Sequence, residues 1–202
     1  MTHSLNKTSR RMVLAGGAAL VAFPKGAFAL SASQAESFVQ TVVNEVLSIV
    51  NSGQSEAAVL PQFERLFGRY AGISTIARSV LGPAYRAASG AQQRQFNEAF
   101  QHYMSFKYGR QFNEFRGSSI SIVRVREAGN AQFLVESQVR QPNQSPFALE
   151  FHVFDSGSGG PKMFDLIIEG IRLISSEREE VRAMLNAEGN NLNRLIARLN
   201  AY

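Results

Sequence analysis

The chain has 202 residues and no cysteine, with 21 lysines and arginines against 16 aspartates and glutamates. The length suits one domain with a hydrophobic core of ordinary size, and the lack of cysteine excludes disulfides, zinc–thiolate sites, thiol nucleophiles and a lipoprotein anchor. Four basic residues and no acidic one precede residue 30, which leaves 17 basic against 16 acidic residues. A nearly neutral domain does not attract a polyanion, so nucleic acid is not expected as a partner.

The first 29 residues have the pattern of a twin-arginine signal peptide. Arg10 and Arg11 precede a weakly apolar run over 12–23, and Ala27-Phe28-Ala29 has the small-x-small pattern of a signal-peptidase site. An apolar run of about 12 residues is too short to span a bilayer, which takes about 20. The sequence therefore predicts a signal peptide over 1-29, cleaved after Ala29, and a periplasmic domain over 30-202 without a permanent membrane anchor.

The first part of the mature chain has the pattern of three helices. Ser33-Gln34-Ala35-Glu36 has the form of a capping box, and the helix that follows reaches about Asn51 with its apolar residues on one face. Two shorter helices are expected over about 61–70 and 74–80. Leu81-Gly82-Pro83 ends the second of them, because proline cannot continue a helix and glycine frees the backbone.

A long helix rich in aromatic residues comes next. Ser89-Gly90-Ala91-Gln92 has the form of a second capping box, and the helix after it extends to about Arg116. Its aromatic side chains spread over more of the circumference than one stripe would: Phe96, Phe100, Tyr103, Phe106, Tyr108, Phe112 and Phe115. Such a helix is expected to face a core on one side and another apolar environment on the other.

From Ser118 onward the apolar residues alternate with polar ones, which indicates strands. Four strands are predicted, over about 119–127, 131–141, 147–155 and 162–168. The segments between them are too short for crossover helices, so the sheet should be an antiparallel meander. In the third strand one face carries Phe147, Leu149, Phe151 and Val153.

Two C-terminal helices, near 176–186 and 191–200, complete the predicted domain. Helices, then a meander, then helices describe an α+β fold. We expect a curled antiparallel four-stranded sheet packed on N-terminal and C-terminal helices, with the sheet curled over the long aromatic helix.

Several segments resemble the MlaC, or toluene-tolerance, family in order and spacing. They are Leu81-Gly82-Pro83-Ala84-Tyr85-Arg86, then Ala88-Ser89 with Gln92-Gln93-Arg94, Phe96, Phe100 and Tyr108-Gly109, and finally Phe164-Asp165-Leu166-Ile167-Ile168-Glu169-Gly170-Ile171 with Leu173-Ile174 and Arg178. Together they extend over about residues 65–185. The resemblance implies a cone-like fold similar to nuclear transport factor domains, with an apolar cavity that holds acyl chains between sheet and helices.

The same resemblance implies a function. Members of the family carry phospholipid between an outer-membrane lipoprotein complex and an inner-membrane ABC transporter with an MCE-domain subunit, and so maintain the lipid asymmetry of the outer membrane. It implies neither a cofactor nor an enzymatic activity. Twin-arginine export is not the usual route of the better-known members. A hopanoid-associated subfamily shares the domain, so a sterol-like lipid is an alternative cargo.

Apolar residues at alternating strand positions are typical of a packed core, but the resemblance favours a core that encloses a cavity. The candidate lipid-binding wall residues are Tyr70, Ile73, Phe100, Tyr103, Met104, Ile122, Phe133, Val135, Leu149, Phe151, Phe164, Leu166 and Ile168. The sequence alone does not separate wall residues from ordinary core residues.

Two other classes of function stay open. A small-molecule enzyme would hold an acid or base in an apolar pocket, with Asp165, Tyr103 and His152 as first candidates. The simpler interpretation pairs Asp165 with a neighbouring basic side chain. The mature histidines, His102 and His152, have no third ligand at metal-site spacing, so no metal is expected. A scaffold that binds only proteins would have no cavity.

Overall fold

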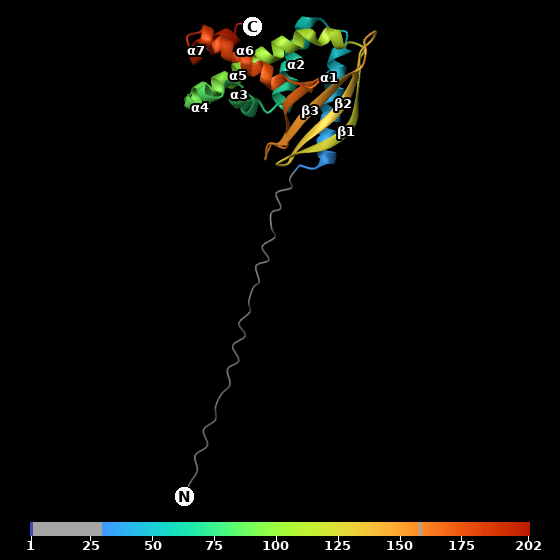
Figure 1. The fold of residues 1–202 in the computed structure, drawn as a ribbon, viewed down its shortest axis with the longest axis horizontal. Coiled ribbons are helices and arrows are strands. Elements are labelled where there is room, and N and C mark those ends of the chain that lie inside the picture. The colour runs from blue at the N-terminus through green and yellow to red at the C-terminus, as the bar shows by residue number, and fades with distance from the viewer. Residues whose placement is uncertain (2–29, 158) are drawn as a thin grey trace.

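A five-stranded antiparallel sheet packs on one long helix, with a group of further helices beside it, in the computed structural model of the chain (Figure 1). The structure describes residues 1, 30–157 and 159–202. The predicted twin-arginine motif and cleavage site lie outside the described residues. None of the helices in the described part of the chain is long and apolar enough to span a bilayer.

The predicted helices and strands occur in the predicted order, with additional short helices over Pro83–Ala87 and Arg110–Phe115. The aromatic helix, predicted to reach about Arg116, ends at Gly109. The helices are α1 (Ala32–Val50), α2 (Glu56–Tyr70), α3 (Ile73–Leu81), α4 (Pro83–Ala87), α5 (Gly90–Gly109), the 3-10 helix η1 (Arg110–Phe115), α6 (Leu173–Ala187) and α7 (Leu192–Leu199). The strands are β1 (Ser119–Gly129), β2 (Gln132–Arg140), β3 (Phe147–Asp155), β4 (Pro161–Ile168) and β5 (Ile171–Arg172).

Capping boxes begin both long helices. Ser89 and Gln92 form the predicted box at the start of α5. At α1 the predicted box is wrong by two residues. Ser31 is the N-cap, and its hydroxyl accepts from the Gln34 N–H while the Gln34 side chain accepts from the Ser31 N–H. Both serines have a glutamine or glutamate three residues later, so the local pattern does not distinguish them.

Two other helices begin earlier than predicted. α2 begins at Glu56, and Pro61 lies inside it, where the ring removes one backbone hydrogen bond without ending the helix. α6 begins at Leu173, because the carboxylate of Asp165 on β4 accepts a hydrogen bond from the Ile174 N–H in its first turn. That acceptor is distant in sequence from a usual N-cap position, so the local sequence does not reveal it.

The sheet is an antiparallel meander of five strands in chain order, which confirms the predicted topology and corrects the predicted number of four. The added strand, β5, follows a two-residue turn. Glu169 and Gly170 form this turn with φ of 50° and 80°, and Ile168 pairs with Ile171 across it. Positive φ at both central residues is the geometry of a tight hairpin.

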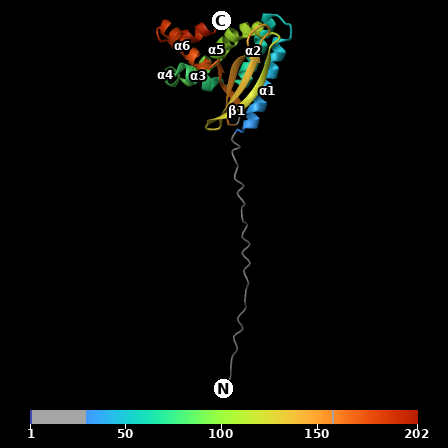
Figure 2. The same ribbon diagram turned by 45° about the vertical axis from the view of Figure 1, so that its right-hand side comes forward.

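The sheet curls over α1 rather than over the aromatic helix α5, which corrects the expected packing (Figure 2). Ala35, Val39 and Val42 of α1 are buried in one core with side chains of β2, β3 and β4. α5 forms the centre of a second core with α2, α3 and α7, where Phe96 and Phe100 are fully buried. The two cores meet along α2 and β4.

Candidate functional site

An apolar cavity of about 210 Å³ lies where the two cores meet, between the inner face of the sheet and helices α1, α2 and α5. It has 19 lining residues, and only Tyr108 and Gln111 among them have polar side chains. The sheet contributes Phe147, Leu149 and Phe151, which share one face of β3 as the alternation predicted. A cavity with this lining suits hydrocarbon better than a polar or charged molecule.

The structure places five of the thirteen predicted wall residues on this cavity: Met104, Leu149, Phe151, Leu166 and Ile168. The other eight pack elsewhere. Phe133 and Val135 are buried between the sheet and α1, where Tyr70 and Ile122 pack against them, while Phe100 and Tyr103 are buried in the helical core, where Ile73 and Phe164 pack. That any of the thirteen contacts lipid stays a prediction.

A bulge in the sheet explains the position of Phe164. The pairing of β3 with β4 shifts between His152 and Val153, so Val153 lies opposite Met163. An unbroken ladder would place Phe164 opposite Val153 and direct its ring to the inner face. The extra residue gives that inner position to Met163 instead.

The sequence interpretation missed the contributions of α1 and α2 to the wall. These helices provide Val42, Val43, Val46, Leu47, Phe63, Leu66 and Phe67. The apolar stripe on α1 was recognised as a buried face, but sequence does not tell which helix lies under the sheet. The remaining wall residues not predicted are Tyr108, Gln111, Phe115, Ile120, Phe147, Met163 and Leu173.

The cavity opens at the end of the sheet where β4 ends and β5 begins. Among its lining residues, Gln111 of η1 and Ile168 of β4 are exposed, and Phe115, Ile120 and Phe147 are half-buried. Ile171, the cross-strand neighbour of Ile168, is 67% exposed. Apolar side chains in contact with solvent therefore surround most of the mouth, together with the polar Gln111.

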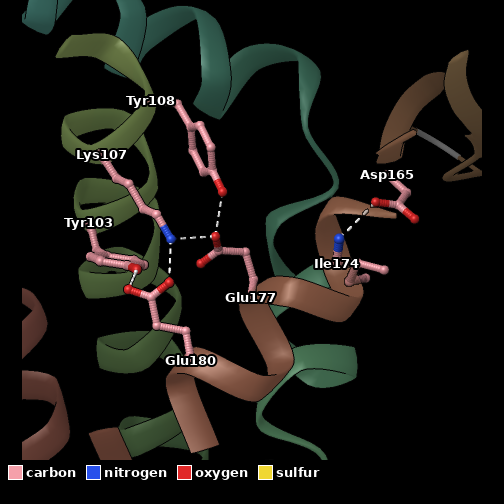
Figure 3. A network of polar contacts seen from close by, with 7 residues as sticks. All are labelled: Tyr103, Lys107, Tyr108, Asp165, Ile174, Glu177 and Glu180. Carbon is pink, nitrogen blue, oxygen red and sulfur yellow. Dashed lines mark hydrogen bonds and ion pairs between the residues drawn. The ribbon is translucent and has the colours of Figure 1, made fainter. Parts of the chain in front are cut away.

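A network of charged and hydroxyl groups joins α5 to α6 beside the cavity (Figure 3). The Lys107 ammonium donates to Glu177 Oε1 at 2.7 Å and also bonds Glu180. The Tyr103 hydroxyl donates to Glu180 at 2.8 Å, and the Tyr108 hydroxyl donates to Glu177. Tyr108 lines the cavity, and its hydroxyl already donates a hydrogen bond to Glu177.

The pKa values in this network favour a fixed arrangement of charge. Burial, followed by hydrogen bonds to Glu180 and Glu177, raises the pKa of Tyr103 and Tyr108 far above its usual range. Burial opposes the charge on Lys107, but its two carboxylate partners outweigh that effect and raise its pKa. Both phenols are thus hydrogen-bond donors to carboxylates near neutral pH.

Asp165 pairs with a basic side chain, as predicted. It is buried, and Arg172 Nε donates to its Oδ2 at 2.9 Å while the Ile174 N–H donates to its Oδ1 at 2.9 Å. The same guanidinium reaches His152, with Nη2 donating to Nδ1 at 3.1 Å. Asp165 and His152 thus lie together, but Tyr103 does not join them, because its hydroxyl bonds Glu180 on the other side of Glu177.

The described residues contain no group of three or more histidine, aspartate or glutamate side chains placed to hold a metal ion. None of Asp165, His152 and Tyr103, the side chains considered for an enzyme, lines the cavity. The cavity is an apolar space with a polar network behind one wall.

The sequence profile of the family described as MlaC protein matches residues 40–201, which include every residue that lines the cavity. Among solved structures, a phospholipid-binding protein from Ralstonia solanacearum, in complex with a phospholipid, has a TM-score of 0.67 with this chain. The two share 21% sequence identity over 82% of this chain and 98% of the other, a likeness that shows a common fold. The profile match extends over most of the sequence, and the chain therefore belongs to the MlaC family.

Proposed function

We propose that this protein is a periplasmic phospholipid carrier that holds acyl chains in the cavity between α1, α2, α5 and the sheet. The observation that carries the proposal is the lining itself, which is apolar at 17 of 19 residues and opens at one end. The family membership and the phospholipid in the Ralstonia solanacearum relative support the same ligand class.

The energetics of lipid transfer explain why such a protein needs no catalytic residue. A diacyl lipid has roughly 30 methylene groups, and exposing them to water would cost on the order of 24 kcal/mol at about 0.8 kcal/mol each. A carrier must therefore cover nearly all of both chains. In a bilayer the chains are already out of water, so exchange between bilayer and cavity is close to neutral and its direction comes from partners.

The volume of the cavity bears on how lipid enters. Pockets that bury most of a drug-sized ligand measure roughly 300–1,000 Å³, whereas this one measures about 210 Å³. Two acyl chains therefore require the walls to move apart. Met104 and Met163 on those walls are flexible side chains that adapt readily to new shapes.

The polar lining favours a carrier over a small-molecule enzyme. The Tyr108 hydroxyl is bonded to Glu177, and Gln111 lies at the exposed mouth, where a headgroup would remain in water. An apolar cavity contacts chains rather than headgroups, so we expect weak headgroup selectivity. A hopanoid or other sterol-like lipid is an alternative cargo for the same lining.

The cellular route belongs to the proposal as well. The twin-arginine pattern and the cleavage motif after Ala29 favour export to the periplasm. There the carrier would exchange phospholipid with an outer-membrane lipoprotein complex and with an inner-membrane ABC transporter that has an MCE-domain subunit. Both partners are inferred from family membership.

Native mass spectrometry of protein purified from periplasm without detergent, followed by lipid extraction, tests the proposal. We expect about one phospholipid per protein, and a hopanoid mass in its place would identify the alternative cargo. Protein that is free of lipid and takes none from phospholipid vesicles would contradict the carrier function.

A further inference from the structure

A narrow crevice of about 50 Å³ adjoins the inner side of the cavity. The two spaces share five lining residues: Phe67, Met104, Met163, Leu166 and Leu173. These side chains therefore form a partition between the cavity and the crevice. Behind the partition, Ala71, Ile76 and Ile174 are buried and give the crevice an apolar lining of its own.

Charged groups close the far side of the crevice. Asp165 and Glu177 line it, and both are buried. Asp165 is held by Arg172 and the Ile174 N–H. Glu177 is held by Lys107 and Tyr108 (Figure 3). A hydrocarbon chain cannot replace those hydrogen bonds, so extending a chain past the crevice would leave buried charges without partners.

Two members of the partition, Met163 and Met104, have deformable side chains, and the helical core contributes Met104. Met104 comes from α5, is 4% exposed, and touches both spaces. Its unbranched side chain fills irregular gaps and changes rotamer easily, unlike the ring of Phe67. Shortening it would join the crevice to the cavity while the charged wall stays in place.

We propose that Met104 sets the length of the acyl chain that the cavity accepts, with the crevice and its charged wall as the limit. The inference rests on the proposed carrier function. The partition ends the space available to a chain, and the charged wall prevents a longer chain from continuing into the helical core. Met104 is thus a specificity-determining residue for chain length.

The test compares Met104→Ala with Met184→Ala. Met184 is 6% exposed and belongs to the helical core, but it lines neither space, so it controls for loss of a buried methionine side chain. The unaltered protein and each variant are purified from periplasm and then exchanged with vesicles that contain equal amounts of dimyristoyl, dipalmitoyl and distearoyl phosphatidylglycerol. Native mass spectrometry reports which lipid each protein holds.

Met104→Ala removes three heavy atoms, so we expect the preferred chain to lengthen by about two methylene groups. Met184→Ala should keep the preference of the unaltered protein. Equal chain-length distributions in Met104→Ala and the unaltered protein, each with one lipid bound, would overturn the inference and leave the carrier function intact. If the unaltered protein holds no lipid, the carrier function itself fails.

Leu173→Ala keeps the test decisive if Met104→Ala does not fold. Leu173 belongs to the same partition but is half-buried at the first residue of α6, so its truncation removes less buried surface. The same lengthening is expected, and an unchanged preference in this folded variant would again overturn the inference.

Discussion

The positive charge of Lys107 on α5 balances the negative charges of two carboxylates on α6, Glu177 and Glu180. Glu177 is 1% exposed, and the Lys107 side chain is 26% exposed, so this pair is shielded from solvent. Lys107→Met would leave Glu177 buried without its counter-charge, which typically costs about 3–5 kcal/mol. Urea unfolding should show this loss as a lower midpoint with an unchanged slope.

Arg110→Met is the matched control for that variant. Arg110 follows α5 and pairs with Glu56, but both side chains are exposed, at 58% and 44%. Removing an exposed pair changes stability by about 0–1 kcal/mol. Equal losses in the two variants would show that burial does not distinguish the pairs.

His152 gives stability a pH dependence near neutrality. Burial, and then the positive charge of Arg172, lowers the pKa of His152. Because Arg172 Nη2 donates to Nδ1, the neutral ring carries its proton on Nε2, which bonds Gln132 Oε1 at 2.7 Å. Protonation of Nδ1 would remove the acceptor that Arg172 uses.

The direction of this pH dependence follows from the protonation of His152 in the folded and unfolded states. The unfolded histidine binds its proton at a higher pH than the folded one, so the stabilisation is complete above about pH 6.5 and is lost as pH falls below it. We expect the urea midpoint to decrease between pH 7.5 and 5.5. In His152→Gln the urea midpoint should fall less over this pH range. In His102→Gln, a control on α5, it should fall as much as in the unaltered protein. An identical pH profile for His152→Gln would contradict the assignment.

At the scale of elements, the β4–β5 turn fixes the exposed rim of the cavity. Gly170 has φ of +80°, and a Cβ added there would meet no atom within 4 Å. Gly170→Ala would therefore cost only conformational strain, about 1–2 kcal/mol. A lower thermal midpoint, with native circular dichroism at room temperature, is the expected result.

Gly90→Ala tests whether that cost comes from the backbone conformation. Gly90 begins α5, its φ is not positive, and an added Cβ would lie 3.7 Å from the end of the flexible Arg94 side chain. Alanine favours a helix over glycine, so this substitution should be neutral or stabilising. A comparable loss in both variants would refute the role of positive φ at Gly170.

The elements were predictable to the extent that their causes are local. The alternation of β3 predicted its bounds, and the Ser89 capping box predicted the start of α5. The start of α6 depends on Asp165 from β4, and the position of Phe164 depends on a bulge against β3. Both causes are tertiary, so local periodicity does not reveal them. Four of the five predicted residues that line the cavity lie on β3 or β4, where the inner face of a strand is visible in sequence, and Met104 on α5 is the fifth. The helices that face the strands are not visible in this way.

At the scale of the whole molecule, the cavity is the junction of two cores. Val42, Leu149 and Phe151 belong to the core between the sheet and α1, and Met104 belongs to the helical core. The buried residues of the two cores form separate clusters, so the junction between them is where we expect the structure to widen with the least loss of packing. The proposed carrier function requires widening, because the volume of about 210 Å³ is below the roughly 300 Å³ of small ligand pockets.

We therefore expect the two cores to move apart when lipid binds. The chain has no cysteine, so cysteines introduced for spin labels at Ser48 on α1 and Glu98 on α5, both exposed, would be the sole labelling sites. The distance between them should increase when lipid-free protein is loaded from phospholipid vesicles. A control pair at Glu98 and Arg182, on α5 and α6 within the helical layer, should keep its distance. If mass spectrometry shows one bound phospholipid and neither distance changes, the cores do not separate, and side-chain rearrangement alone must accommodate the chains.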